Sequence, residues 1–410
     1  MEKKKNILYL SSWYPNHNDP TLGIFVRRHA LSASQYCTIT VVHASSSKNC
    51  IQAQTQISES EIKEVIIHYP KSKINWLFIG RLIDQINYIK YTLKGIGSTT
   101  NNIRDYDLVQ VNIAFPVGII ALLLKWFYGL SYILLEHWTG YLPSDGNYLK
   151  SNWLKKRIIK SIVKNAKAVI TVSEDLRNEM LSHKLKNKYY IISNVVDQKI
   201  FYPPHQLITS STNQLINKSS HQLITSSANQ QINILHVSTL NDKQKNINGI
   251  IQAAEKLKNE SLNFVLHIVG DGPEKKQYEQ LCEQKNLLPH HVKFYGLKTE
   301  TEIAELMRNA HFLLLFSNYE NLPCVMLEAM MCGLPIISTN VGDISRHITI
   351  QNGILIHPKN EEELLIAIKN MMRNYSLSNR YSIAKYAEER FSMNVVGEKF
   401  RSIYQNSPKI

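Results

Sequence analysis

The chain has 410 residues, which is enough for two or three domains of ordinary size. Hydrophobic residues make up 44% and charged residues 20%, so the chain can bury cores and is not a disordered polymer. Five scattered cysteines without paired spacing argue against a disulfide scaffold or a zinc module and fit a reducing compartment. The net charge of +14 is uneven, because residues 1–200 carry 26 Lys and Arg against 14 Asp and Glu, and residues 201–410 carry 21 against 19. The basic first half predicts an anionic partner.

Neither the start of the chain nor its most apolar stretch predicts a membrane span. The apolar run at residues 7–10 is too short for the hydrophobic region of a secretory signal. The stretch from 118 to 135 is interrupted by Lys125 and Gly129, and it divides naturally into a helix and a buried strand. We therefore expect a cytoplasmic protein, either free in solution or bound to a membrane surface.

Short apolar runs alternate with amphipathic stretches, which is typical of parallel α/β sheets. In the first half, strands are expected near 6–11, 38–44, 63–68, 107–111, 131–136, 168–172 and 189–193, and helices near 22–34, 76–96, 117–128, 151–165 and 175–184. In the second half, strands are expected near 232–237, 263–269, 291–295, 312–315, 334–338 and 353–356, and helices near 246–258, 274–286, 300–309, 324–332 and 361–373. The pattern predicts two doubly wound units in series, with ligands outside the carboxyl ends of the strands.

A polar segment separates the two halves. Residues 205–214 recur almost unchanged as residues 221–230. Two copies are too few for a solenoid, so 201–231 is interpreted as a polar linker with a duplicated low-complexity insertion and no chemistry of its own. The linker would separate an N-terminal domain of residues 1–200 from a C-terminal domain of residues 232–390.

The most informative stretch runs from 312 to 335. It starts as an apolar strand, turns at Glu320 and Asn321, and enters a helix near Pro323, a residue that the first helical turn tolerates. Free N–H groups at a helix start favour phosphate, and a carboxylate beside them favours sugar hydroxyls. Taken alone, these residues also allow a plainer interpretation, in which Glu320 only caps the helix and Glu328 is a solvated helical charge.

This stretch resembles the motif of glycosyltransferase family 4, whose members are retaining enzymes of the GT-B fold. That motif has two glutamates separated by seven residues and then a fixed Ala-Met-Gly-Pro spacing, here filled by Glu320, Glu328, Ala329, Met330, Gly333 and Pro335. Further matches stand in the family's order: residues 13–15 with Gly23, then 136–138, 194–197, 270–273 and 352–355. The resemblance covers nearly the whole chain except the repeated insertion.

The resemblance implies an α/β protein of the GT-B fold, with two Rossmann-like doubly wound domains facing a central cleft. The segment of about 391–410 would form a helix that crosses back to the first domain. The implied activity is that of a hexosyltransferase, which moves a hexose-type sugar with retention from a nucleotide-diphosphate sugar of the UDP or GDP type. The implied acceptor is a glycan or a lipid-linked molecule in cell-envelope, lipopolysaccharide or exopolysaccharide synthesis.

The resemblance also assigns roles to single residues. Glu320 and His137 would face the donor sugar, and Lys245 would hold the diphosphate, so these three form the expected catalytic set. Glu328 would bind the ribose hydroxyls. The other expected donor-binding residues are Gly23, Thr239, Lys243, Gly270, Asn321, Leu322, Pro323 and Cys324.

One position departs from the family pattern. The family's arginine six residues before the lysine is replaced by Thr239, which offers a hydroxyl and no charge. Either another cation replaces it, with Lys243 and Arg27 as candidates, or turnover is weak. A catalytically weak homologue that binds sugar nucleotides or glycans in an assembly complex is therefore an alternative. A sugar-nucleotide epimerase of the same fold is a second, which the paired glutamates disfavour.

We expect no cofactor and no metal ion. In the GT-B fold, protein cations and helix dipoles neutralise the diphosphate in place of a metal. Asp105 and Asp107 superficially resemble a D-x-D metal motif, but they stand directly before an apolar strand and are interpreted as its polar lead-in.

Cations are concentrated on the predicted helix at 151–165, where Lys155, Lys156, Arg157, Lys160 and Lys164 alternate with apolar residues. Such a helix can lie on anionic lipid, with each cation contributing about 1 kcal/mol near the surface. The alternative is a surface helix that packs its apolar stripe on the sheet. Nucleic acid is not expected, because no ladder of stacking aromatics accompanies the charge. The protein is thus expected on the inner face of the plasma membrane as a peripheral protein.

Overall fold

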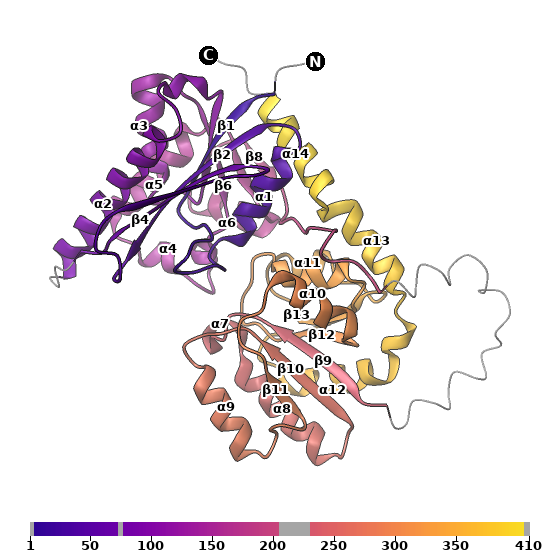
Figure 1. Cartoon of the computed structure of the whole chain (residues 1–410). Coiled ribbons are helices and arrows are strands. Elements are labelled where there is room, and N and C mark those ends of the chain that lie inside the picture. Colours follow the sequence, from indigo (N-terminus) through magenta and orange to yellow (C-terminus); the bar gives the residue numbers. More distant parts are fainter. Residues whose placement is uncertain (1–3, 73–76, 205–229, 406–410) are drawn as a thin grey trace. The chain divides into compact units, whose positions relative to one another are not determined.

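The computed structural model describes residues 4–72, 77–204 and 230–405. The chain divides into two compact units (Figure 1). Unit 1 comprises Met1–Val195 and Met393–Ile410, and unit 2 comprises Val196–Ser392. Of the predicted linker at 201–231, residues 205–229 lie outside the described part of the chain.

Unit 1 is built on an eight-stranded sheet with the order β3-β4-β2-β1-β5-β6-β7-β8. Its strands are β1 (Asn6–Ser11), β2 (Thr38–Ser47), β3 (Gln54–Glu59), β4 (Lys63–Pro70), β5 (Leu108–Asn112), β6 (Tyr132–Glu136), β7 (Val169–Thr171) and β8 (Tyr189–Ile191). All of them pair in parallel except β3, which pairs antiparallel with β4. Every residue of β5, β6 and β7 is buried, as expected for parallel strands covered on both faces.

The main helices of unit 1 are α1 (Ile24–Ser34), α2 (Leu77–Gly97), α3 (Gly118–Tyr128), α4 (Asn147–Lys150), α5 (Trp153–Asn165), α6 (Glu174–Ser182) and α14 (Met393–Gln405). The C-terminal helix α14 lies beside α1, where the Ser32 hydroxyl donates to the Met393 carbonyl at 2.7 Å (Figure 1). The hydroxyls of Tyr404 on α14 and Tyr9 on β1 are 2.6 Å apart in the buried core. The last helix of the chain is therefore an integral part of unit 1.

Unit 2 has a six-stranded, fully parallel sheet with the order β11-β10-β9-β12-β13-β14. Its strands are β9 (Ile232–Val237), β10 (Phe264–Val269), β11 (Val292–Phe294), β12 (Phe312–Leu315), β13 (Ile336–Thr339) and β14 (Gly353–Ile356). Its helices are α7 (Asp242–Lys245), α8 (Ile247–Asn259), α9 (Lys275–Gln284), α10 (Glu300–Asn309), α11 (Cys324–Met331), α12 (Glu361–Asn374) and α13 (Arg380–Phe391). The strand order places β9 and β12 next to each other in the middle of the sheet.

Four of these elements were not predicted from the sequence: β3, the short helices α4 and α7, and the 12-residue helix α13. All six residues of β3 are exposed and mostly polar, because an edge strand that pairs on one side need not present an apolar face. A helix of four residues is too short for a periodic apolar pattern. Among the helices that the structure describes, none has both the length and the apolarity needed to cross a bilayer.

Candidate functional site

The expected donor-binding residues of unit 2 lie in the loops that follow β9 and β12. The backbone N–H of Asn318 donates to the carbonyl of Gln244 at 2.7 Å, and its side-chain amide donates to the carbonyl of Lys243 at 3.1 Å. These bonds fix the loop after β12 to α7, which follows β9. The two loops therefore form one preorganised surface at the carboxyl edge of the sheet, where ligands of doubly wound sheets bind.

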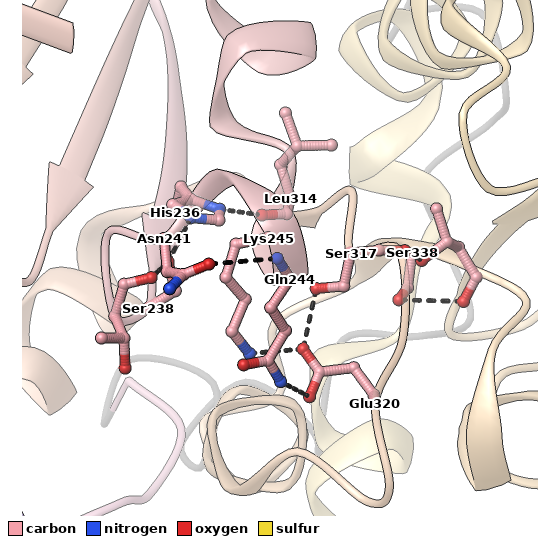
Figure 2. A network of polar contacts seen from close by, with 11 residues as sticks. His236, Ser238, Asn241, Gln244, Lys245, Leu314, Ser317, Glu320 and Ser338 are labelled. Atoms are coloured by element: carbon pink, nitrogen blue, oxygen red, sulfur yellow. Dashed lines mark hydrogen bonds and ion pairs between the residues drawn. The ribbon is translucent and has the colours of Figure 1, made fainter. Parts of the chain in front are cut away.

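Glu320 is the centre of this surface, and Figure 2 shows the side chains that converge on it. The residue is only 5% exposed. Its carboxylate accepts hydrogen bonds from the Lys245 ammonium, from the Ser317 hydroxyl at 2.7 Å and from the Gln244 amide at 3.4 Å (Figure 2). The structure thus brings Glu320 and Lys245 together as an ion pair, although 75 positions separate them in the chain.

His236, near the end of β9, connects β12 to the loop after β9 and was not among the expected site residues. Its Nδ1 lies 2.8 Å from the Leu314 carbonyl, which can only accept, so Nδ1 carries the proton. Its Nε2 lies 2.7 Å from the Ser238 hydroxyl (Figure 2). Burial, with a smaller contribution from the charge of Lys245, lowers the pKa of His236 to about 4, so the ring is neutral at physiological pH. A lone histidine inside an apolar strand was the only signal that could have revealed it.

Gly270 joins a third loop to the same surface. Its φ is +132°, and a Cβ atom there would lie 1.8 Å from the carbonyl oxygen of Ser238. Only glycine allows the loop after β10 to approach the loop after β9 so closely. Gly270 therefore shapes the backbone beside Thr239, whatever contact it makes with a ligand.

The remaining donor-loop residues lie around the start of α11. The Asn321 carbonyl accepts from the backbone N–H of Asp343 at 3.0 Å, Leu322 is buried, and Pro323 and Cys324 begin the helix. No side chain caps α11, so the plainer interpretation of Glu320 as a helix cap is wrong. Glu328 on α11 is 7% exposed, so it is not a solvated helical charge either.

The position of the missing arginine is occupied by an exposed residue. Thr239 is exposed in the loop after β9, and Lys243 is exposed on α7. Arg27 of unit 1, the other candidate substitute, donates through Nε to the Glu64 carboxylate at 2.9 Å. Lys243 has no such ion pair among the described residues, and it stands two positions before Lys245 on the same short helix.

In unit 1, the motif at the end of β6 is organised by Glu136, whose role the sequence analysis missed. Glu136 is fully buried and accepts from three backbone N–H groups, those of Ala114 at 3.0 Å, His137 at 2.9 Å and Trp138 at 3.0 Å. The Tyr141 hydroxyl donates a fourth hydrogen bond at 3.3 Å. Burial raises the pKa of Glu136, and these hydrogen bonds oppose that effect. An acidic residue at the end of an apolar strand was the available signal.

His137 packs against α1, the helix that Gly23 precedes. The His137 ring lies 4.3 Å from the Phe25 ring and 5.4 Å from the His29 ring, measured between centroids. Burial, together with His29, holds the pKa of His137 well below its usual value, so the ring is uncharged at neutral pH. Gly23 has φ +65°, and a Cβ atom there would lie 2.5 Å from the Trp13 carbonyl oxygen. Close packing within its own loop is therefore enough to require glycine at position 23. That Gly23 also contacts the donor stays a prediction.

The five cations of the basic helix differ in exposure, with Lys155 and Lys156 partly buried and the other three exposed, and whether any of them meets a membrane stays a prediction. The half-buried Lys155 ammonium lies over the Trp138 ring at 4.7 Å and the Phe115 ring at 5.2 Å, and burial lowers the pKa of Lys155. It lines a small cavity of about 150 Å³ together with Glu136. The Lys156 ammonium donates to the Leu149 carbonyl at 2.6 Å.

The other three cations, Arg157, Lys160 and Lys164, are exposed. Trp153, at the start of the same helix, is 72% exposed, and its neighbour Leu154 is 51% exposed. The exposed side chains of α5 therefore include three cations and two large apolar residues.

Within the described residues, no group of three or more His, Cys, Asp or Glu side chains could hold a metal ion. The Asp107 carboxylate accepts from the backbone N–H of Asn6 at 2.8 Å, and the Asp105 carboxylate accepts from the Thr100 hydroxyl at 2.5 Å. Both aspartates thus have structural partners beside the start of β5. That the protein works without a metal stays a prediction.

Solved structures show which fold these two units form. Sucrose-phosphate synthase from Thermosynechococcus elongatus aligns with a TM-score of 0.75 at 17% sequence identity, covering 98% of this chain and 99% of that one. HepE from Anabaena, solved in complex with UDP-glucose, aligns with a TM-score of 0.67 at 16% identity, covering 98% and 99%. The chain is a GT-B protein, as predicted.

Sequence comparisons then establish the family. The profile described as "Glycosyltransferase Family 4" matches residues 33–199, and the profile described as "Glycosyl transferases group 1" matches residues 220–390. An uncharacterized glycosyltransferase of Methanocaldococcus jannaschii is 28% identical over 353 residues, which is 85% of this chain and 86% of the relative. The chain belongs to glycosyltransferase family 4 and is a glycosyltransferase.

Proposed function

We propose that this protein is a retaining hexosyltransferase that uses a nucleotide-diphosphate sugar of the UDP or GDP type. The observation that carries the proposal is the ion pair of Lys245 and Glu320 at the carboxyl edge of the unit 2 sheet. These are the two residues for which the family resemblance implies contact with the diphosphate and the sugar. The UDP-glucose bound to HepE, a protein of the same fold, supports a uridine nucleotide as the first donor to test.

The reaction breaks the bond between the anomeric carbon and the diphosphate oxygen, the acceptor oxygen forms the new bond to that carbon, and the proton of the acceptor hydroxyl passes to the leaving diphosphate. Negative charge then builds up on the leaving diphosphate, and a preorganised cation stabilises that charge most effectively. Lys245 can supply this charge because its partner Glu320 is held by two further donors, Ser317 and Gln244. The neutral His137 ring would donate or accept one hydrogen bond with the sugar without adding charge.

The proposed acceptor is a glycan or a lipid-linked molecule of cell-envelope or exopolysaccharide synthesis, reached at an anionic membrane surface. Arg157, Lys160 and Lys164 beside the exposed Trp153 and Leu154 support this part of the proposal. Exposed cations attract anionic headgroups, and an exposed tryptophan enters the interfacial region.

A second candidate is a catalytically weak homologue that binds sugar nucleotides or glycans within an assembly complex. The exposed Thr239 in place of an arginine favours it, because a hydroxyl cannot balance the charge of a leaving diphosphate. Such a protein would bind the donor nucleotide and release no nucleotide in the presence of an acceptor.

The decisive test is calorimetric titration of the full chain with UDP, GDP, ADP and their sugar conjugates in EDTA. We expect one nucleotide to bind, and Glu328→Ala to abolish its binding, because the buried Glu328 carboxylate is the proposed ribose ligand. Glu283→Ala, which removes an exposed carboxylate from α9, is the matched control and should bind as the wild type does. Absence of binding by every nucleotide to a folded protein would contradict the proposal. Loss of binding in EDTA alone would contradict metal independence.

A further inference from the structure

Unit 1 contains a second candidate site, apart from the residues discussed so far. A cavity of about 690 Å³ lies where β2 and β4 end, between the β3–β4 hairpin and the loop after β1. Its volume falls within the range of ligand pockets, about 300–1,000 Å³. The loop after β1 that lines it is the one that ends at Gly23. The cavity therefore shares the carboxyl edge of the sheet with the region predicted to meet the substrates.

The lining of this cavity is uncharged and rich in amides. Five of its side chains are amides, namely Asn18, Asn49, Gln52, Gln54 and Gln56, and two more are hydroxyls. No Lys, Arg, Asp or Glu is among the described residues that line it. An amide both donates and accepts hydrogen bonds, as a sugar hydroxyl does, so such a lining matches a polyhydroxylated and uncharged ligand.

His68 is one of the two histidines in the lining, and it too is neutral. Its Nδ1 lies 3.5 Å from the side-chain nitrogen of Asn18, which can only donate, so Nδ1 accepts and the proton sits on Nε2. Burial, with His17 nearby, lowers the pKa of His68. The described residues that line the cavity thus supply no Lys, Arg, Asp or Glu charge with which to balance an anionic ligand.

The β3–β4 hairpin places several of these groups on one face. Gln54 lies directly opposite His68 in the antiparallel pairing, and Gln56 follows two residues later on the same face. The side-chain amides of Gln52, Gln54 and Gln56 have no hydrogen-bonding partner among the described residues. All three amides are exposed, so they are free to form hydrogen bonds with a ligand in the cavity.

We propose that this cavity binds an uncharged oligosaccharide portion of the acceptor. The proposal rests on the proposed transferase function and deepens it, because it makes the acceptor a neutral glycan chain rather than a small acid or a bare lipid phosphate. The cavity is larger than one reacting hydroxyl group requires, so it would hold sugar units next to the one that is glycosylated.

The test uses the full chain without nucleotide, so that it is independent of donor binding. Short neutral oligosaccharides of hexoses and N-acetylhexosamines are screened on a glycan array beside chains of similar length that contain uronic acids or phosphate. We expect neutral chains to bind and the charged chains to bind about tenfold more weakly or not at all. The neutral hits are then titrated by calorimetry.

The variant Gln54→Ala/Gln56→Ala should weaken a neutral hit about tenfold or more, since it removes two hydrogen-bonding side chains and leaves the backbone ladder of β3. Gln52→Ala should weaken binding less. Because Gln52 lies outside β3, a loss in this variant cannot result from disruption of the strand. Asn101→Ala, an exposed amide before β5, is the matched control and should have no effect.

Each outcome separates the two proposals. No neutral oligosaccharide bound, tighter binding of charged chains, or unchanged affinity in the double variant would overturn the acceptor proposal. Nucleotide binding measured on the same samples would be unaffected in all of these cases. Glycan binding without any nucleotide binding would instead contradict the proposed transferase function and leave the glycan site standing.

Discussion

Two buried glutamates, one in each unit, lie at the carboxyl edge of the unit's sheet and are held in different ways. Glu136 ends β6 in unit 1, and Glu320 follows β12 in unit 2. Each links the loops of two neighbouring strands, Glu136 through Ala114 after β5 and Glu320 through Lys245 after β9. The carboxylate of Glu136 accepts mainly from backbone N–H groups, whereas that of Glu320 accepts from three side chains.

This difference separates scaffold from binding surface. A backbone N–H group cannot leave its partner without moving the loop, and a buried N–H group without an acceptor costs about 1–3 kcal/mol. A lysine or glutamine side chain can rotate toward a ligand and return afterwards. We therefore infer that Glu136 fixes the position of the His137 loop and that the partners of Glu320 are available for exchange with a substrate.

The largest effect is expected on kcat when the ion pair of Lys245 and Glu320 is broken. Lys245→Ala removes the cation proposed to stabilise the leaving diphosphate, and loss of one such preorganised group lowers kcat about 10²- to 10³-fold. The measurement is the rate of nucleotide release from the donor sugar that the titrations identify. Removing one partner of this buried ion pair should also lower the free energy of unfolding, by about 3–5 kcal/mol, so the rate is measured at a temperature at which circular dichroism shows both proteins folded.

The control for this variant is Lys256→Ala, which removes an exposed lysine from α8 in the same unit. It should release nucleotide at the wild-type rate. If Lys245→Ala also retains the wild-type rate while binding the nucleotide, Lys245 has no role in the reaction. That result would contradict the inference that the partners of Glu320 exchange with a substrate.

The next largest effect is expected on the free energy of unfolding when Glu136 is replaced. Glu136→Ala leaves three buried N–H groups without an acceptor and should lower the free energy of unfolding by roughly 3 kcal/mol or more. Glu136→Gln should lower it less, because its one amide oxygen still accepts from two of them. Urea unfolding of both variants measures this difference, and equal losses would contradict the backbone-held role.

The wild type and Glu136→Gln should also differ in how their free energy of unfolding depends on pH. Since the pKa of Glu136 is raised in the folded state, ionised Glu136 opposes folding. Its unfavourable contribution appears as the pH rises from the ordinary carboxyl pKa, about 4.5, through the raised pKa, and it is absent below that window. This part of the decline in stability with rising pH should be missing in Glu136→Gln.

Most of the fold could be predicted because parallel strands buried on both faces are continuous apolar runs that stand out from amphipathic helices. The exposed strand β3 has no such run, and its neighbour β4 alone determines that residues 54–59 are extended. The candidate site followed the same logic. Glu320 and Lys245 were found through a family motif, whereas His236 and Glu136 act through backbone contacts that no spacing in the sequence reveals.

The different exposure of the cations on α5 could have been predicted from helical spacing. Lys155 stands four residues before the buried Ile159 and seven before the buried Ile162, so helical spacing places it on the face toward the sheet. Arg157, Lys160 and Lys164 share a different face at spacings of three and seven. Counting the cations without assigning them to faces made Lys155 a surface residue.

The smallest predicted effects, about 1 kcal/mol for each cation, test this division of α5. The triple variant Arg157→Gln/Lys160→Gln/Lys164→Gln should weaken binding to vesicles of mixed neutral and anionic lipid, measured by cosedimentation at low salt. Lys155→Gln should bind them as the wild type does, because its ammonium is half-buried over Trp138. The wild-type affinity should fall as salt is added, since exposed charges are screened within about 10 Å at 0.1 M ionic strength. Equal losses in the two variants would mean that Lys155 reaches the lipid, and binding that ignores both charge and salt would leave Trp153 and Leu154 as the membrane contact.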